Sequence, residues 1–297
     1  MAFPTDTLTG TDLAVFIPEI WGDMINDFAK DVQVLSKFVT DRSYELTGGG
    51  DTIYTPGLTE MSANSKTVAT AVTLNDPTET PVTLTVDNWY EVSFAIEDLQ
   101  AVQYKQSYYI QERYAKNAGY TAGNVLEDAI IDLIPSFTSS VGGSTSVVLE
   151  SDIYKALGIV EDAVKEEVDN GNFAFFFDRK VFWNQIAPLD LFQLNTNTPT
   201  ADPLMKTPVK YIHNVPVYVS SRIDYVSGTT GRYNALMHRD AIHIATSTLP
   251  GQGSGMVRVQ SNYEASYLST VTTADLAYGV VMNRATYGVK FITSASA

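Results

Sequence analysis

Residues 97–134 read EDLQAVQYKQSYYIQERYAKNAGYTAGNVLEDAIIDLI. Apolar and alanine side chains recur along this stretch at spacings of three and four, which is the period of a helix with one buried face. The acidic pair Glu97 and Asp98 suits the positive end of a helix, and Pro135 would end it. The sequence therefore predicts one long helix over residues 97–134.

The length of this helix bears on the shape of the molecule. A helix of about 38 residues would span roughly 57 Å. A compact chain of 297 residues would be only roughly 50 Å across, so we expect an elongated or flat molecule. The alternative is a break near Gly119 to Gly123, which would give two shorter helices and an ordinary shape.

The stretch before the helix has the pattern of extended strands. Residues 82–86 read VTLTV and residues 92–96 read VSFAI, and both alternate apolar with small or polar side chains. The part around residues 62–76 offers little to bury. Because a two-stranded hairpin is marginal alone in water, a long hairpin here must lie on another surface. The alternative is a disordered surface loop.

The N-terminal part predicts an arm, a helix and a turn. Residues 1–12 are polar and rich in Thr, and a helix starts near Pro18 with apolar side chains at helical spacing through Phe28. Residues 48–50 are three glycines followed by Asp51. A phosphate-binding loop would need a Gly-Lys-Ser/Thr end that is missing, so we expect a flexible turn.

A second unit is predicted beyond a boundary at residues 136–146, which are rich in Ser, Thr and Gly. A helix capped by Ser151 or Asp152 leads to a stop at Asn170-Gly171, and Phe173 to Phe177 reads as a buried strand followed by a cap at Asp178. Residues 188–208 predict an exposed loop. Further strands are predicted at 215–219, 235–238, 242–245, 257–259, 278–282 and 289–292.

Composition narrows the classes of function. Hydrophobic residues make up 44% of the chain and charged residues 18%, which is typical of a globular protein. The net charge of −15 disfavours tight nucleic-acid binding. The chain has no Cys, which excludes disulfides and thiolate chemistry. We find no signal peptide and no membrane-spanning run, and expect a soluble protein with no membrane partner.

No motif predicts a catalytic, cofactor-binding or metal site. His238 and His243 are expected on opposite faces of a strand, which does not make a zinc pair. Asp128 and Asp132 are expected to be solvated on the outer face of the long helix. Tyr108 and Tyr109 on that helix favour packing at a protein interface over base stacking, because few basic residues lie among them.

The order of these parts resembles the tailed-phage major capsid protein with the Hong Kong 97 type shell fold. The segments that carry the resemblance are Ile17 to Trp21 (IPEIW), Asn214 to Ser220 (NVPVYVS) and Tyr278 to Val281 (YGVV). The resemblance implies an α+β fold over nearly the whole chain. Its expected parts are an N-terminal arm and first helix (1–44), an extended β-hairpin loop (45–96), a spine helix of a peripheral domain (97–139), an axial α/β domain (140–250) and closing β strands of the peripheral domain (251–297).

The resemblance also implies partners and contact residues. The chain would assemble with itself as pentamers and hexamers in a closed shell, the capsid of a virion built in the bacterial cytoplasm. A separate scaffolding protein, a portal and a decoration protein are possible partners, and packaged DNA would be bound only weakly. Some family members cross-link a Lys of the extended loop to a neighbour, but ordinary non-covalent contact is expected for Lys66. The residues expected to contact other subunits are Tyr54, Lys66, Trp89, Tyr108 and Tyr109.

The leading hypothesis is therefore a structural shell subunit and not an enzyme. One alternative is the shell of an encapsulin-like protein compartment. A second, from another class, is a β-rich hydrolase that uses His213, His238 or His243. A third is an acidic adhesin or tail component.

Overall fold

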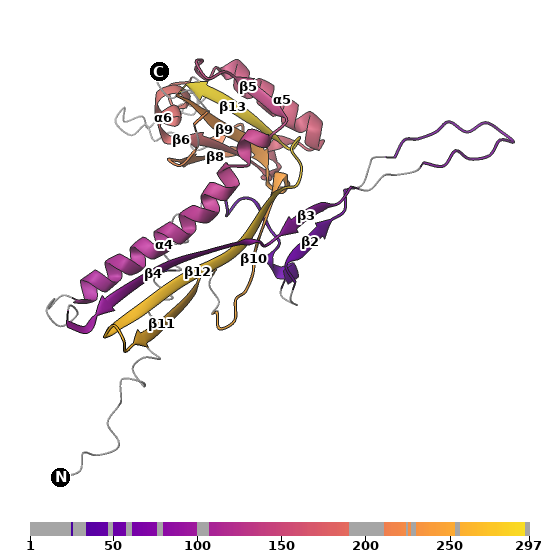
Figure 1. Ribbon diagram of the computed structural model, residues 1–297. Helices are drawn as coiled ribbons and strands as arrows, with labels where there is room; N and C mark the ends of the chain where they lie inside the picture. Colours follow the sequence, from indigo (N-terminus) through magenta and orange to yellow (C-terminus); the bar gives the residue numbers. More distant parts are fainter. Residues whose placement is uncertain are drawn as a thin grey trace, which may run out of the picture.

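The computed structural model describes residues 25, 34–46, 50–57, 61–75, 80–99, 107–189, 211–223, 225–226, 230–252 and 256–294. These residues form an elongated lobe, a compact lobe and a loop that extends far from both (Figure 1). Among the helices described, none has the length and hydropathy of a membrane span.

The elongated lobe is a long helix beside a twisted sheet (Figure 1). The strand order is β1-β10-β12-β11, and β4 pairs with β12 as well. The elements of this lobe are α4 (Ser107–Ile131), β1 (Thr40–Asp41), β4 (Asn88–Glu97), β10 (Ile242–Thr246), β11 (Arg258–Glu264) and β12 (Ser269–Met282).

Helix α4 confirms part of the predicted long helix. Its 25 residues run unbroken through Gly119 and Gly123, so the alternative of a break there is wrong. At 1.5 Å per residue α4 is about 37 Å long. The helical prediction is wrong for Glu97, which is the last residue of β4 and pairs with Ser269. The alternating pattern of β4 continues to that residue, and strand pairing prevails there over the helical signal.

Small side chains bring α4 close to the sheet. Ala115, Ala118 and Ala122 are buried on the helix face that meets β4, where Val92 and Phe94 pack against them. The strand predicted over residues 92–96 is confirmed, but its partner is β12, over ten consecutive residue pairs, and not the other strand of the hairpin. The partner lies about 180 residues away in sequence, which a local pattern does not reveal.

The hairpin has a short paired base. Strand β2 (Thr52–Thr55) pairs antiparallel with β3 (Val82–Thr85), and Ile53 and Leu84 are buried with Leu46 and Ala245. A Cβ added to Gly279 of β12 would lie 2.1 Å from the carbonyl oxygen of Thr85. Glycine is thus required where the hairpin base meets the long sheet.

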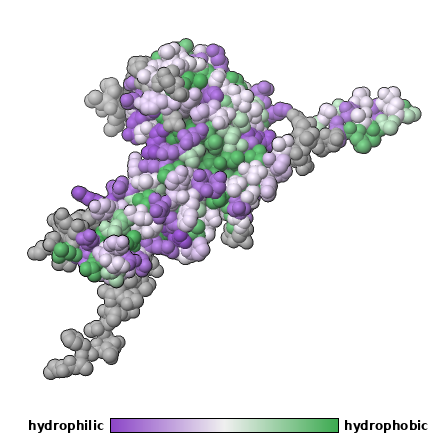
Figure 2. All heavy atoms as spheres, in the orientation of Figure 1, coloured by the Kyte–Doolittle hydropathy of each residue, from purple (hydrophilic) through white to green (hydrophobic). Residues whose placement is uncertain are grey.

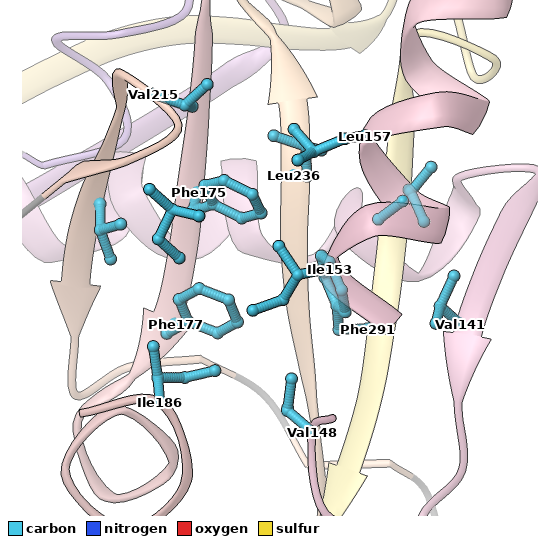
Figure 3. Packing of buried hydrophobic residues seen from close by; sticks show 14 of the residues in the cluster. Val141, Val148, Ile153, Leu157, Phe175, Phe177, Ile186, Val215, Leu236 and Phe291 are labelled. Atoms are coloured by element: carbon cyan, nitrogen blue, oxygen red, sulfur yellow. The ribbon is translucent and has the colours of Figure 1, made fainter. Parts of the chain in front are cut away.

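The compact lobe is a six-stranded sheet with order β5-β13-β9-β6-β8-β7. Helix α5 covers one face, and its Ile153 and Leu157 point at Phe175, Phe177 and Phe291 of the sheet (Figure 3). The elements of this lobe are β5 (Ser139–Gly142), α5 (Glu150–Val164), β6 (Phe173–Asp178), α6 (Arg179–Val181), β7 (Tyr211–Ile212), β8 (Val215–Ser220), β9 (Gly231–His238) and β13 (Gly288–Ser294).

Several local predictions for this lobe are confirmed. All six residues of β6 are buried, as expected for a central strand. The Asp178 carboxylate accepts a hydrogen bond from the Lys180 N–H and caps α6. Short single-turn and π-helical segments complete the chain path: η1 (Ser43–Leu46), η2 (Ile134–Ser136), η3 (Val168–Asn170), η4 (Phe182–Ile186) and η6 (Arg239–Ala241).

The structure divides two predicted segments differently. Residues 136–146 are only partly a linker, because residues 139–142 form the edge strand β5 of the compact sheet. The closing segment 251–297 is shared between the lobes: β11 and β12 lie in the long sheet, whereas β13 lies between β5 and β9. The reason is apolar burial, since Val289 and Phe291 fill the core of the compact lobe.

An apolar cluster joins the two lobes. It combines Leu126 and Ile130 of α4 with Phe176 and Met237 of the compact sheet and Leu276 of the long sheet. Within the part of the chain that the structure describes, three passages join the lobes, at residues 132–138, 239–241 and 283–287. These passages are hydrogen bonded to one another, because Thr138 N–H donates to the Ala285 carbonyl and Asn283 N–H to that of Ala241.

Some predictions fall outside the described residues. The arm 1–12 and most of the predicted helix near Pro18 lie there, although Ile25 is helical and buried against Ala115 and Ala118 of α4. Gly48 and Gly49 of the predicted turn also lie outside, as does the exposed loop 188–208 from residue 190 onward.

Candidate subunit-contact surfaces

The extended loop is the most exposed part of the described chain. Every residue from 61 to 75 is exposed, and hydrogen bonds from Asn75 Nδ2 to the Ser62 carbonyl (2.7 Å) and from Asn64 Nδ2 to Asn75 Oδ1 (3.2 Å) tie its two sides together. Its apolar side chains face solvent: Val68 is 93% and Leu74 85% exposed. Figure 2 shows apolar atoms gathered on this loop, away from either lobe.

Lys66 lies in this loop, where its ammonium donates a hydrogen bond to the Thr70 carbonyl. It is the single charged residue in the segment 61–75. A nearly neutral loop with exposed Val and Leu side chains has the composition of a contact surface.

Tyr54 lies on the outer face of the hairpin base. Its side chain is 67% exposed, whereas that of the adjacent Ile53 is buried. The alternation of a strand puts neighbouring side chains on opposite faces, and Tyr54 therefore extends the exposed surface of the loop towards the lobes.

Trp89 is exposed but held in place. Its side chain is 68% exposed, while its indole Nε1 donates a 2.9 Å hydrogen bond to Asp275 Oδ2. Asp275 is buried and accepts two more hydrogen bonds from Arg258, at 2.9 and 2.6 Å. This bonding raises the pKa of the Arg258 guanidinium. A large aromatic side chain with a fixed orientation loses little entropy on binding, which suits an interface anchor.

Tyr108 and Tyr109 lie in the first turn of α4. Their side chains lie outside the described part of the structure, so their contact role stays a prediction. Among the described tyrosines of this helix, Tyr114 stacks on Phe94 of β4 at 5.5 Å and Tyr120 is half exposed.

The far end of the long sheet carries a surface that the sequence reading missed. Leu99, Tyr267 and Leu268 are 63–75% exposed there, beside Tyr263, whose hydroxyl donates to Asp98 Oδ2 at 2.8 Å. This bond raises the pKa of the Tyr263 hydroxyl. The available signal was two tyrosines four residues apart, Tyr263 near the end of β11 and Tyr267 in the turn that follows.

The acidic residues of α4 whose side chains the structure describes, Glu127 and Asp128, are hydrogen bonded. Asp128, predicted to be free in solvent, accepts two hydrogen bonds from Arg222 of the compact lobe, one of them 2.6 Å from Arg222 Nε. This pairing raises the pKa of Arg222. Asp132 is exposed, as predicted.

Its neighbour Glu127 was not singled out from the sequence. Glu127 is buried and accepts hydrogen bonds from the backbone N–H groups of Val34, Leu35 and Ser36, at 2.8 to 3.0 Å, and from the Ser36 hydroxyl at 2.7 Å. Its carboxylate thereby anchors the backbone of residues 34–36 to helix α4.

The histidines do not occupy the expected positions. His238 ends β9 and His243 lies in β10, so the prediction of opposite faces of one strand is wrong, because η6 turns the chain between them. Both line one open depression between the two lobes, with a volume of about 430 Å³. Burial lowers the pKa of each ring. His213 is exposed on the turn between β7 and β8.

Within the described residues, this depression does not show a serine-type hydrolytic arrangement. In the described residues, the hydrogen bond to the His238 ring comes from the backbone N–H of Asp240, and the Thr40 hydroxyl donates to Asp240 Oδ1. A hydrolase of the serine type needs a hydroxyl bonded to the imidazole. Within the same described ranges, no group of three or more side chains is arranged to hold a metal ion.

Comparisons with known proteins bear on the fold. No family model matches the chain, and no curated protein is similar to it in sequence. Solved structures do match. A structure of Mycobacterium phage Che8 aligns with a TM-score of 0.68 at 15% identity, over 87% of this chain and 90% of its own. The mature capsid of bacteriophage PhiM1 aligns with a TM-score of 0.66 at 10% identity, over 88% and 87%.

This chain has the Hong Kong 97 type capsid fold. The predicted α+β class is thereby confirmed. A virus-like particle from Pyrococcus furiosus has the same fold, with a TM-score of 0.58 at 12% identity, over 93% of this chain and 99% of its own. At such identities the likeness establishes only the arrangement of helices and strands. It does not identify which residues of this chain make contacts.

Proposed function

We propose that this chain is the major capsid protein of a tailed double-stranded DNA phage, a structural subunit without catalytic activity. Copies of it assemble as pentamers and hexamers into the icosahedral head that encloses the genome. The observation that carries this proposal is the extended loop, whose residues 61–75 are exposed throughout and include Val68 and Leu74 with almost no burial.

A loop of this kind is useful in an assembly. Exposed apolar side chains on an arm without a core lose solvent contact only when another surface covers them. A second copy of the chain provides such surfaces on its elongated lobe, including the anchored Trp89. Many modest contacts of this type sum over a closed shell.

The charge of the chain agrees with a genome container. With a net charge of −15, the protein repels the phosphate backbone and lets packaged DNA slide. In this proposal the subunit forms the virion capsid after assembly in the bacterial cytoplasm. A separate scaffolding protein, a portal and a decoration protein are the further partners.

The two lobes take different roles in the proposed shell. The elongated lobe with the spine helix α4 is the peripheral domain, and the extended loop overlaps a neighbour. The compact lobe is the axial domain, and its outer loops meet around the fivefold and sixfold axes. The contact residues proposed for these interfaces are Tyr54, Lys66, Trp89, Tyr108 and Tyr109.

Electron microscopy of the purified protein tests the proposal. We expect closed shells of uniform size, with or without an added scaffolding protein. Monomers and dimers at every concentration, in the presence of the proteins encoded beside it, would contradict a shell role. Fibres or open rings would favour a tail component.

A second candidate is the shell of a protein compartment, because the Pyrococcus furiosus virus-like particle shares the fold over 93% of this chain. Particles isolated from the natural source separate the two functions. Nuclease-protected DNA inside the shell supports the phage head, whereas a single enclosed protein species in mass spectrometry supports the compartment. Replacement of His213, His238 and His243 by Gln tests the hydrolase alternative, since shell formation should survive it.

A further inference from the structure

Two of the passages between the lobes meet at His238. Strand β9 of the compact lobe ends at this residue, and η6 carries the chain into β10 of the long sheet. The Ala241 carbonyl in η6 accepts hydrogen bonds from the N–H groups of Asn283 (2.9 Å) and Arg284 (3.1 Å) on the return passage. The His238 N–H donates to the Tyr287 carbonyl at 2.9 Å. His238 thus lies where the two passages are fastened together.

The neutral ring of His238 has a defined tautomer. Its Nδ1 accepts a hydrogen bond from the Asp240 N–H at 3.2 Å, which caps η6. An acceptor nitrogen carries no proton, so the neutral ring bears its hydrogen on Nε2. Nε2 is buried and, in the described structure, has no hydrogen-bond partner. The ring packs edge-on against Phe173 and Tyr287, with centroids 4.9 and 5.7 Å away.

Two carboxylates lie just beyond hydrogen-bonding distance. Glu166 Oε2 is 3.7 Å from Nε2, and Asp240 Oδ2 is 3.9 Å from Nδ1. Burial is the main cause that lowers the pKa of His238; these two carboxylates act in the opposite direction and Arg239 in the same one. The titratable and charged groups that surround His238 and His243, from every element packed against them, are Arg42, Tyr44, Glu45, Glu166, Arg239, Asp240, Arg284 and Tyr287.

We propose that His238 is a proton-sensitive latch on the joint between the two lobes. A proton on Nδ1 breaks the hydrogen bond from the Asp240 N–H, because two N–H groups would then face each other. The charged ring then turns towards the carboxylates of Glu166 and Asp240. The cap on η6 is lost, and the two passages loosen.

The joint can loosen without coming apart. The apolar cluster between the lobes, with Ile130, Phe176 and Leu276, is held by contacts that have no strict direction. Hydrogen bonds do require a direction, so the hydrogen bonds around His238 limit the angle between the lobes. Protonation of His238 acts on these hydrogen bonds and leaves the apolar cluster in place.

The sign of the pH dependence follows from the burial of the ring. An unperturbed histidine titrates at 6.5, and the pKa of His238 lies below that value. Its stabilising effect is therefore complete above pH 6.5 and is lost as the pH falls through the folded-state pKa. This behaviour belongs to the subunit itself and does not depend on a shell.

Amide hydrogen exchange of the full chain tests the latch, with His238→Gln as the reference. Glutamine can accept the Asp240 N–H through its side-chain oxygen but does not titrate in this range. The ratio of wild-type to variant exchange at each pH removes the intrinsic pH dependence of exchange. We expect a ratio near one at pH 7.5 that rises severalfold as the pH falls below 6.5 towards and through the folded-state pKa, in peptides covering residues 239–246 and 283–290. The ratio for α5 peptides should stay at one.

Two matched variants complete the design. His213→Gln, on an exposed turn, should behave as wild type. A ratio that stays at one over the whole range would overturn the proposal, and so would an equal rise in all peptides, which indicates global acid unfolding. Removal of the pH response by His243→Gln but not by His238→Gln would assign it to the other ring and refute the latch as stated.

Discussion

The extended loop (residues 61–75) and strand β6 are opposite in burial and in packing. Residues 61–75 are exposed without exception, whereas all six residues of Phe173–Asp178 are buried. The strand carries Phe175 and Phe177, which stack at 5.7 Å inside the compact lobe, while the loop holds Val68 and Leu74 in solvent. One chain thus separates residues that stabilise the fold from residues that stay in contact with solvent.

This separation makes stability and assembly independently variable. Substitutions in the core should change the free energy of unfolding, and substitutions in the loop should change only association. Substitution of residues that hold different parts of one subunit together should have an intermediate effect on the free energy of unfolding. The following predictions run from the largest to the smallest effect on unfolding.

The core should give the largest effect. Phe175→Ala removes a fully buried ring and should lower the free energy of unfolding by about 3–5 kcal/mol. Urea unfolding followed by circular dichroism measures the change. Tyr54→Ala is the control, since it removes an aromatic ring that is 67% exposed. Equal losses for both variants would contradict the division between core and contact surface.

Glu127 should come second. Glu127→Gln keeps the shape of the side chain but removes the charge that four hydrogen bonds share, and should lower the unfolding free energy by about 1.5–3 kcal/mol. The same urea experiment applies. Asp132→Asn makes the same chemical change at an exposed position of the region, and a loss as large as that of Glu127→Gln would argue against the buried anchor.

The pair of Asp128 and Arg222 should have a smaller effect. Both side chains are one third or more exposed, so a double-mutant cycle with Asp128→Asn and Arg222→Gln should give a coupling of about 1 kcal/mol or less. The coupling should shrink as salt is added. A coupling that does not respond to salt would mean that solvent does not reach the pair.

The loop should have the smallest effect on unfolding and a complete effect on assembly. The double variant Val68→Asp and Leu74→Asp should unfold at the wild-type urea concentration, because both side chains are almost entirely exposed. Electron microscopy should show no shells. Thr67→Asp with Thr73→Asp adds the same charge but keeps the apolar side chains, and should assemble better. Normal shells from the Val68 and Leu74 variant would remove the loop from the proposed interface.

Local patterns in the sequence predicted much of the secondary structure. The apolar run at Phe173 to Phe177 gave a buried strand and Asp178 its cap, because both depend on neighbours within a few residues. The alternation at Val92 and Phe94 gave β4 as a strand. Its partner β12 was missed, since no local signal records a pairing across about 180 residues.

The contact residues were predicted less completely. Trp89 and Tyr54 are exposed, but the anchoring of Trp89 by Asp275 joins residues that are 186 positions apart. Asp128 looked solvated because its partner Arg222 comes from the other lobe. Polar pairs of this kind leave no periodic trace, whereas burial of apolar faces does.

The placement of β13 delays the completion of both lobes. Its strand lies between β5 and β9, and the passage that leads to it fastens η6 through Ala241. During synthesis, the edge strand β5 therefore lacks its partner in the compact sheet until residues 288–294 have left the ribosome. The extended loop is thus synthesised well before the compact sheet has all of its described strands.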